Sequence, residues 1–360
     1  MVPSVVLMST HTHPSGPVIR TSGLTKSFTR HKKTVEAVRG LDLEVGPGEL
    51  VAFLGPNGAG KSTTVRMLTT LLTPSGGTAR VAGFDVVKQA AQVRRAIGVA
   101  LQDAAIDPLM TGHELLRLQA TLHGIGKADA LRRGQELLER VGLTQAAGNR
   151  VATYSGGMRR RLDLALSLVH QPEVLFLDEP TTGLDPTSRV ALWDEVRYLN
   201  RELGTTVLLT TQYLEEADQL AGRIAIIDGG RIVREGRPSD LKAAVGSATL
   251  RVEVPAGSED KAAAAMATFG EARPARTGVV AIGLDGGAAR MADVVRALDE
   301  VGVVPAGMEL HLPSLDDVFA DATGRRLEGA ADEPADGPDD GAAAAPPASN
   351  GAGRKRGRRP

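Results

Sequence analysis

Short apolar runs alternate with amphipathic stretches along the first two thirds of the chain. The run Glu49–Leu54 is mostly apolar, and it leads through a glycine-rich loop into Thr63–Leu72, whose apolar positions recur at helical spacing. Further apolar runs follow at Val174–Leu177, Val207–Leu209 and Ile224–Ile227. Such unbroken runs are typical of parallel strands that are covered on both faces. Their alternation with helices predicts an α/β fold built on a parallel sheet.

Other stretches extend this pattern towards the end of the chain. Arg80–Gly83 and Ile97–Ala100 are candidates for short strands, and residues 110–141 show helical periodicity. A second, smaller α/β domain is expected over residues 245–328. Its predicted strands are Thr249–Val254, Val279–Leu284 and Met308–Leu312, its predicted helices are Glu259–Phe269 and Ala288–Val301, and a capping box at Ser314 and Asp317 begins a last helix.

The two ends of the chain differ in composition from the rest. Residues 1–17 are rich in turn formers and lack the basic start of a secretory signal, which predicts a disordered leader. From about residue 329 the chain is rich in Ala, Gly, Pro and Asp and then turns basic. It has too few apolar residues to bury, so we expect a disordered tail over 329–360.

Composition narrows the classes of function. The formal net charge is −1 and aromatic residues make up only 3% of the chain, so we expect no specific nucleic-acid partner. The chain has no cysteine, which excludes disulfides and thiolate metal sites, and its seven histidines lack ligand spacing. No apolar run approaches the roughly eighteen residues that cross a bilayer. We therefore do not expect this chain to form a channel by itself.

The loop after the first strand fits the phosphate-binding pattern G-x-x-x-x-G-K-[ST]. Its glycines let backbone N–H groups turn inward towards phosphates, and the helix that follows adds the positive end of its dipole. Lys61 is expected to reach the β- and γ-phosphates, and the Ser62 hydroxyl to hold Mg²⁺. The flanking strand and helix favour this interpretation over a chance glycine-rich turn. The nucleotide-binding residues predicted here are Gly55, Pro56, Asn57, Gly58, Ala59, Gly60, Lys61, Ser62 and Thr63.

A strand that ends in two acids supplies a second part of such a site. Val174–Leu177 runs directly into Asp178 and Glu179. Asp178 can face the magnesium shell through a water molecule, and Glu179 can orient an attacking water or accept its proton. The alternative is a solvated acidic turn, which the phosphate loop in the same chain makes the weaker interpretation.

A second candidate for anion binding begins the helix ahead of the acidic strand. The motif Tyr154-Ser155-Gly156-Gly157-Met158 places a hydroxyl and two glycines at a helix start. An ordinary helix cap is the alternative, since Ser and Gly are common in caps. If the motif does bind phosphate, it grips either the nucleotide held by the same chain or one held by a sister chain.

Taken in order, these motifs resemble the ATP-binding cassette (ABC) family over about residues 18–240. The resemblance implies a P-loop NTPase core over 18–244, with a helical subdomain at about 103–168. It implies ATP and Mg²⁺ as ligands, and a homodimer in which Ser155 and Gly157 close on the γ-phosphate held at Lys61 of the sister chain.

Three further residues are placed by the same resemblance. Gln102 is similar to the Q-loop glutamine, which contacts magnesium and couples to the membrane partner. Asp185, in Thr182-Gly183-Leu184-Asp185, is similar to the D-loop residue that crosses the dimer interface. Phe28 is similar to the aromatic residue that stacks on adenine, and an ordinary core phenylalanine is the alternative for it.

One position departs from the family pattern. After the strand at 207–209 the family usually has a histidine that contacts the γ-phosphate, whereas this chain has Gln212. An amide can donate a hydrogen bond to phosphate but cannot accept a proton. Catalysis is therefore expected to depend on Glu179, Lys61 and Mg²⁺, with Gln212 beside them. This glutamine, the stretch Tyr154–Asp163 and the segment Leu315–Phe319 resemble the daunorubicin/doxorubicin-resistance ATP-binding subgroup, which implies drug export.

We therefore expect an ATP-hydrolysing subunit that works as a homodimer on a separate membrane permease, at the cytoplasmic face of the cell membrane. A soluble cassette ATPase acting on ribosomes or DNA is one alternative. Ribosome-type members resemble two cassettes in one chain and chromosome-type members carry a long insertion, whereas this chain has a single set of closely spaced motifs. A non-hydrolysing nucleotide sensor is the other alternative, which Gln212 motivates and the intact Asp178 and Glu179 oppose.

Overall fold

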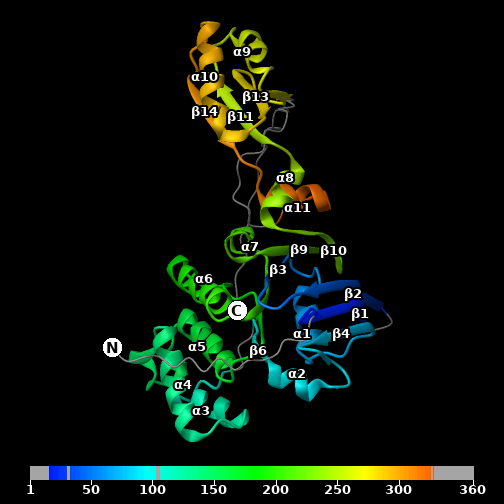
Figure 1. Cartoon of the computed structure of the whole chain (residues 1–360), viewed down its shortest axis with the longest axis vertical. Helices are drawn as coiled ribbons and strands as arrows, with labels where there is room; N and C mark the ends of the chain where they lie inside the picture. Colours follow the sequence, from blue (N-terminus) through cyan, green and yellow to red (C-terminus); the bar gives the residue numbers. More distant parts are fainter. Residues whose placement is uncertain (1–15, 31–32, 103–105, 326, 328–360) are drawn as a thin grey trace, which may run out of the picture. The chain divides into compact units, whose positions relative to one another are not determined.

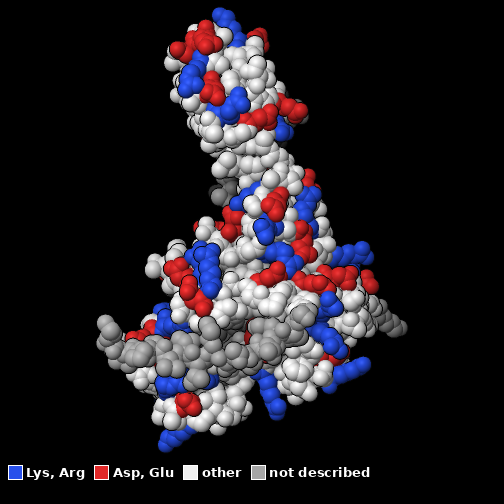
Figure 2. Space-filling model, viewed as in Figure 1, with Lys and Arg blue, Asp and Glu red and all other residues white. Residues whose placement is uncertain are grey.

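The computed structural model of the chain describes residues 16–30, 33–102, 106–325 and 327 (Figure 1). The predicted tail over 329–360 and nearly all of the predicted leader lie outside the described residues. None of the helices in the described ranges is long and apolar enough to cross a membrane. Acidic and basic side chains are interspersed over the face of the molecule drawn in Figure 2.

A six-stranded sheet forms the centre of the described chain. Its strands lie in the order β10 (Arg231–Gly236), β9 (Arg223–Asp228), β3 (Leu50–Leu54), β8 (Thr206–Thr211), β7 (Val174–Asp178) and β6 (Ile97–Ala100). The strands from β9 to β6 run parallel, and β10 pairs antiparallel with β9 at the edge. The parallel sheet predicted from the apolar runs is therefore confirmed.

Alternate side chains of the central strands enter two different hydrophobic cores. In β3, Leu50, Ala52 and Leu54 belong to one core, while Val51 and Phe53 belong to the other. None of these five side chains is more than 4% exposed. A strand covered on both faces needs an unbroken apolar run, which explains the sequence pattern.

A separate antiparallel sheet covers one face of the central sheet. Its strands, in order, are β2 (Lys33–Val45), β1 (Ile19–Arg30), β4 (Gly76–Val81) and β5 (Phe84–Asp85). Of these, the sequence predicted only a strand at Arg80–Gly83, which in the structure begins at Gly76. The β1–β2 hairpin escaped prediction because its outer half is exposed: Phe28 and Val35, which pair across it, are 44% and 63% exposed.

Helices cover the sheet from both sides, as Figure 1 shows. The side towards the antiparallel sheet holds α1 (Lys61–Leu68) and α2 (Ala90–Ala96), and the other side holds α3 (Gly112–Leu122), α4 (Lys127–Arg140), α5 (Gly156–Leu168), α6 (Pro186–Arg201) and α7 (Leu214–Leu220). Short 3-10 turns lie at Thr144–Ala146 and Val151–Thr153.

Two helices end earlier than the sequence pattern predicted, because a residue with a left-handed backbone conformation follows each of them. The helix predicted at Thr63–Leu72 ends at Leu68, because Thr70 has a φ of 65° that a right-handed helix cannot contain. The helical stretch predicted over 110–141 divides into α3 and α4 at Gly124, whose φ is 74°.

Residues 248–311 form a βαββαβ unit with a core of its own. Its elements are β11 (Ala248–Glu253), α9 (Glu259–Met266), β12 (Gly270–Arg273), β13 (Val279–Leu284), α10 (Met291–Glu300), which a 3-10 turn at Gly287–Arg290 precedes, and β14 (Gly307–His311). The sheet order is β12-β13-β11-β14, with every pair antiparallel, which is the ferredoxin-like arrangement. Leu250, Ile282 and Leu298 are among its buried side chains.

The last helix returns to the larger core. Helix α11 (Leu315–Thr323) begins at the predicted capping box, in which the Ser314 hydroxyl accepts a hydrogen bond from the Asp317 N–H at 3.2 Å. Although α11 lies within the predicted accessory domain 245–328, its side chains Leu315, Val318 and Phe319 belong to the core under the central sheet. There α11 packs against α8 (Pro238–Val245).

We predict that Phe319→Ala destabilises the core of the central sheet. The Phe319 side chain is fully buried, and truncation of a buried phenylalanine costs about 3–5 kcal/mol. Trp193, the only tryptophan, is buried in the same core, so its fluorescence during urea unfolding reports the loss. Val304→Ala is the control, because Val304 is 73% exposed. A Trp193 transition that Phe319→Ala does not move would contradict the packing of α11.

Candidate nucleotide-binding site

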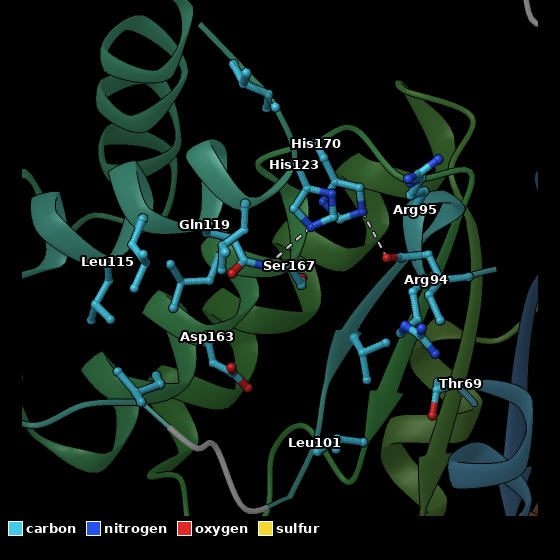
Figure 3. A pocket seen from close by; sticks show the side chains of 18 of the residues that line it. Thr69, Arg94, Arg95, Leu101, Leu115, Gln119, His123, Asp163, Ser167 and His170 are labelled. Atoms are coloured by element: carbon cyan, nitrogen blue, oxygen red, sulfur yellow. Dashed lines mark hydrogen bonds between the residues drawn. The ribbon is translucent and has the colours of Figure 1, made fainter. Parts of the chain in front are cut away.

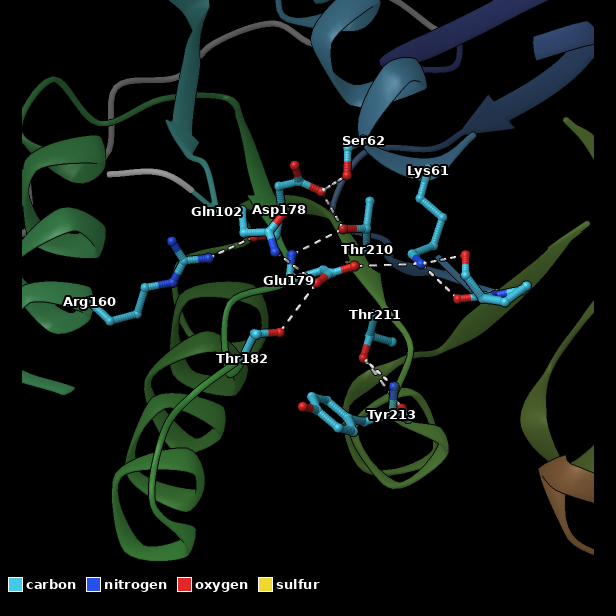
Figure 4. A network of polar contacts seen from close by, with 12 residues as sticks. Lys61, Ser62, Gln102, Arg160, Asp178, Glu179, Thr182, Thr210, Thr211 and Tyr213 are labelled. Carbon is cyan, nitrogen blue, oxygen red and sulfur yellow. Dashed lines mark hydrogen bonds and ion pairs between the residues drawn. The ribbon is translucent and has the colours of Figure 1, made fainter. Parts of the chain in front are cut away.

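The phosphate loop and the acidic strand end meet at the carboxyl edge of the central sheet (Figure 4). Parallel strands β3, β7 and β8 all end at this edge, so the residues that follow them come together. The Ser62 hydroxyl donates a hydrogen bond to Asp178 Oδ1 at 2.9 Å, and the Thr210 hydroxyl donates to the same oxygen at 2.6 Å. Three segments that are distant in sequence are thus joined through one carboxylate.

Glycines of the loop allow close approach of the backbone to its neighbours. A Cβ at Gly55 would lie 2.2 Å from the carbonyl oxygen of Ile227, and a Cβ at Gly60 would lie 2.5 Å from that of Ala37. Gly60 also has a φ of 105° and begins α1 without a side-chain cap. The first N–H groups of α1 therefore have no competing side-chain acceptor at the position where helix starts bind phosphate.

Lys61 is buried inside the loop. Its Nζ donates to the carbonyl oxygens of Gly55 at 2.6 Å and Pro56 at 3.1 Å, and it lies 3.5 Å from Glu179 Oε1. Burial lowers the pKa of Lys61, and the neighbouring carboxylates of Glu179 and Asp178 oppose that shift. The structure thus places the predicted phosphate ligand and the predicted general base in contact.

Glu179 adopts a backbone conformation that is unusual for its residue type. Its φ is 48°, and its N–H donates to both the carbonyl and the hydroxyl oxygen of Thr210, at 3.1 and 3.0 Å. A non-glycine residue in this region costs of the order of 1–3 kcal/mol, which the surrounding structure must offset. Its Oε2 accepts hydrogen bonds from Gln102 Nε2 at 3.4 Å and Thr182 Oγ1 at 3.3 Å.

The oxygens around Asp178 fit a magnesium ion. The Asp178 side chain is 1% exposed, and its Oδ2 has no hydrogen-bond partner within the described residues. A buried carboxylate oxygen is costly unless a cation or a water molecule satisfies it. Mg²⁺ prefers oxygen ligands and keeps several waters, so Ser62 Oγ and Asp178 Oδ2, directly or through water, are suitable donors.

The predicted signature residues lie at the start of α5, away from this network. Ser155 is the N-cap of α5, and its hydroxyl accepts a hydrogen bond from the Met158 N–H at 3.2 Å. Ser155 and Gly156 are exposed, whereas Gly157 is buried against Ser188, whose Oγ lies 2.9 Å from the position of an added Cβ. The helix cap considered from sequence is therefore present, and no hydrogen bond between described residues joins it to Asp178 or Lys61.

The remaining predicted residues occupy separate positions. Asp185 is the exposed N-cap of α6, and hydrogen bonds from the Ser188 hydroxyl and N–H lower the pKa of its carboxyl. Gln212 is half-buried directly after β8. Phe28 is exposed on β1, with Lys26 Nζ 5.2 Å from its ring centroid. The alternative of a core phenylalanine is therefore wrong, and adenine stacking stays a prediction.

Comparison with known proteins identifies the family of the chain. Residues 38–182 match the family described as ABC transporter. The daunorubicin resistance ATP-binding protein DrrA3 of Streptomyces coeruleorubidus is 48% identical, over 82% of this chain and 94% of its own length. The chain belongs to the ABC transporter family.

Further similarities support the assignment of this chain to the ABC transporter family. The daunorubicin/doxorubicin resistance ATP-binding protein DrrA of Streptomyces peucetius is 55% identical over 66% of this chain and 70% of its own. The linearmycin resistance protein LnrL of Bacillus subtilis is 35% identical over 82% and 96%. A solved dimer of the ATP-binding cassette MJ0796 with ADP and Pi is 25% identical to this chain and superposes with a TM-score of 0.57. The match covers 61% of this chain and 98% of the MJ0796 chain. The P-loop NTPase fold and the resemblance to the drug-resistance subgroup are confirmed.

Thr182, Thr210 and Arg160 belong to the network but were not predicted as site residues from the sequence of this ABC ATPase. Thr210, which contacts both Asp178 and Glu179, directly follows the apolar run of β8, and nothing in the sequence distinguishes it from its neighbour Thr211. Arg160 lies on α5 and donates to backbone carbonyls beside Asp178. The helical spacing of Gly157, Arg160 and Leu164, all buried on one face of α5, is the signal that could have separated it from its arginine neighbours.

A groove of about 1310 Å³ lies beside the segment that leads to Gln102 (Figure 3). Its lining comes from α2, β6, α3 and α5 and includes Leu101 and Leu115. The rings of His123 and His170 stack in it with their centroids 3.8 Å apart, and His170 Nε2 lies 2.9 Å from the carbonyl oxygen of Ile97. The groove is therefore lined by exposed and buried leucines together with two stacked histidines.

We predict that His170 lowers the free energy of unfolding of the ABC ATPase as the pH falls from about 6.5 to about 4, while the carboxyl of Asp163, whose pKa burial raises to about 6, contributes in the opposite direction. Burial, and then the neighbouring His123, lower the pKa of His170 to about 4, from an ordinary value of 6.5. Between these values the unfolded chain binds a proton that the folded chain does not, so protonation favours unfolding. Urea titrations at several pH values measure the fall.

The variant His170→Gln should remove the His170 contribution, because glutamine does not titrate, so its free energy of unfolding should fall less than that of the wild type between pH 6.5 and 4. His113→Gln is the matched control, since His113 is exposed on α3, the helix whose C-cap is His123. Equal slopes for His170→Gln and the wild type between pH 6.5 and 4 would show that His170 is not responsible.

Proposed function

We propose that this ABC ATPase is the nucleotide-binding subunit of an exporter of hydrophobic drugs or antibiotics. It works as a homodimer with Mg²⁺ and ATP and drives a separate integral-membrane permease from the cytoplasmic face of the membrane. The observation that carries the proposal is the buried network in which Lys61, Asp178 and Glu179 converge at the sheet edge. Three of the relatives are named as resistance ATP-binding proteins, which supports drug export.

Each part of the network has a role in the proposed reaction. The loop N–H groups and Lys61 bind the phosphates, and Ser62 and Asp178 hold the ion. When bound, Mg²⁺ neutralises charge on the phosphate oxygens. Glu179 orients a water molecule and accepts its proton as the water oxygen bonds to the γ-phosphorus and the bond to the β-phosphate oxygen breaks. ADP and phosphate are the products.

Exposed motif residues support the proposed dimer. Ser155 and Gly156 stand exposed at the start of α5, and Asp185 stands exposed at the start of α6. The hydroxyl and the backbone N–H groups of the α5 start offer donors to a γ-phosphate that a sister chain holds. The solved cassette structures that resemble this chain are described as dimeric.

The groove beside Gln102 supports the proposed permease contact. Leu118 and Leu122 on α3 line it and are 45% and 72% exposed. Exposed leucines in a groove gain free energy when an apolar segment of another protein covers them. A permease segment docked there would touch residues that lead directly to Gln102, and through Gln102 would act on Glu179.

We predict that Glu179→Gln binds ATP, loses hydrolysis and accumulates as a closed dimer. The amide keeps the size of the side chain but cannot accept a proton, and the loss of a general base lowers the rate by about 10²–10⁴-fold. Phosphate release measures hydrolysis, and light scattering with Mg²⁺ and ATP measures the dimer. Normal turnover by Glu179→Gln would contradict the role assigned to Glu179.

Gln212→Ala provides the comparison for this experiment. Because an amide does not shuttle protons, the loss of rate should be smaller than that of Glu179→Gln. A loss as large as that of Glu179→Gln would shift the main catalytic role towards Gln212. A wild-type chain that binds ATP without turning it over would instead favour the nucleotide-sensor alternative.

We predict that negatively charged side chains introduced into the groove disrupt the permease complex and leave the rate of ATP hydrolysis by the isolated chain unchanged. Leu118→Asp and Leu122→Asp place carboxylates where an apolar segment would be buried, which is costly without a partner. Co-purification with a co-expressed membrane permease measures the complex. Val304→Asp, on the exposed surface of the βαββαβ unit, is the control. A complex that survives both groove variants would place the docking surface elsewhere.

A further inference from the structure

Arg160 directs its guanidinium at three backbone carbonyls beneath the network of Figure 4. It lies on α5 and is 9% exposed. Its Nη2 donates to the carbonyl oxygen of Asp178 at 2.7 Å, its Nε donates to that of Pro180 at 2.9 Å, and its Nη1 donates to that of Leu101. One side chain therefore joins the start of the helical region to two loops of the sheet edge.

These three carbonyls flank the two residues that surround the site of water attack. Asp178 and Pro180 lie on either side of Glu179, and Leu101 precedes Gln102. Glu179 and Gln102 are themselves joined, through Nε2 and Oε2 at 3.4 Å. Because Glu179 has a φ of 48°, its backbone needs outside support, and the two flanking carbonyls receive that support from Arg160.

Arginine is suited to this task by its shape. The guanidinium is planar and holds its N–H donors in a fixed fork, so three acceptors can be fixed relative to one another. Asp163, one turn along α5, places Oδ2 3.5 Å from Arg160 Nη1 and provides the nearest counter-charge. Burial lowers the pKa of Arg160, and the carboxylates around it oppose that shift.

We propose that Arg160 is a positioning residue for ATP hydrolysis. It holds Glu179 and Gln102 at the angle in which they orient water, and it does so from the helix that Ser155 begins. The inference rests on the proposed role of Glu179 as the group that activates water. It assigns to Arg160 an effect on the chemical step and none on the affinity for ATP.

The test is Arg160→Lys, which keeps the positive charge but removes the planar arrangement of N–H donors. An ammonium group has three donors on one atom, so it cannot reproduce the spacing of the Nε, Nη1 and Nη2 donors with which Arg160 reaches the three carbonyls. A misplaced catalytic group costs about 100-fold in rate, so kcat should fall by about that factor, while KM and the Kd for ATP stay at their wild-type values. Arg161→Lys is the control, because Arg161 donates to the carbonyl oxygen of Val141, away from the network.

A double variant separates positioning from a structural role. If Arg160 acts through Glu179, adding Arg160→Lys to Glu179→Gln lowers kcat no further. If it only stabilises the fold, the two losses multiply and the Kd for ATP rises, which would overturn the proposal. Rates are referred to ATP-binding sites, and folding is followed by Trp193 fluorescence. If Arg160→Lys does not fold, Arg160→Gln is used in its place, and the expected changes in kcat, KM and Kd are the same.

Failure of the inference is distinct from failure of the proposed function. If Glu179→Gln is inactive and Arg160→Lys turns over ATP at the wild-type rate, the positioning role of Arg160 is overturned alone. If Glu179→Gln is as active as the wild type, the role of Glu179 is overturned and the inference falls with it.

Discussion

Strands buried on both faces hold few charged or strongly polar side chains before they end, and this constraint sets where the chemistry of the protein lies. In β3 and β7 every residue up to the strand end is buried, so polar groups gather at the carboxyl edge. The parallel direction of the strands brings those ends to one edge. The hydrogen bonds of Ser62 and Thr210 to Asp178 are the result, and they fix the phosphate loop against the acidic strand.

The parts of the site that lie on these strands were predictable for this reason. An apolar run such as Val174–Leu177 can be only a buried strand or a buried helix segment, and the two acids after it limit the choice. The phosphate loop was also predictable, because its glycines meet constraints that no other residue satisfies. Gly55 and Gly60 approach neighbouring carbonyls too closely for any side chain. The sequence pattern thus records constraints that are local and severe.

Features that depend on distant packing were not predictable in the same way. The β1–β2 hairpin is difficult to predict from sequence because half of it is exposed. Helix α11 follows the βαββαβ unit in sequence but buries Phe319 in the larger core. Arg160 stands between two other arginines, and only its position against three carbonyls distinguishes it. In each case the deciding neighbour comes from another part of the chain, so no local pattern carries the information.

The contact between Lys61 and Glu179 would link phosphate binding in the loop to the position of the carboxylate that we propose as the general base. The ammonium has three N–H donors, and three oxygens already surround it: two loop carbonyls and Glu179 Oε1. A phosphate that takes one of these donors must displace an oxygen. The carboxylate, at 3.5 Å, is the most distant of the three and the only one with a full negative charge, so a negatively charged phosphate repels it most. Binding of phosphate would therefore separate Glu179 from Lys61 and leave the carboxylate, still held by Gln102 and Thr182, to face water.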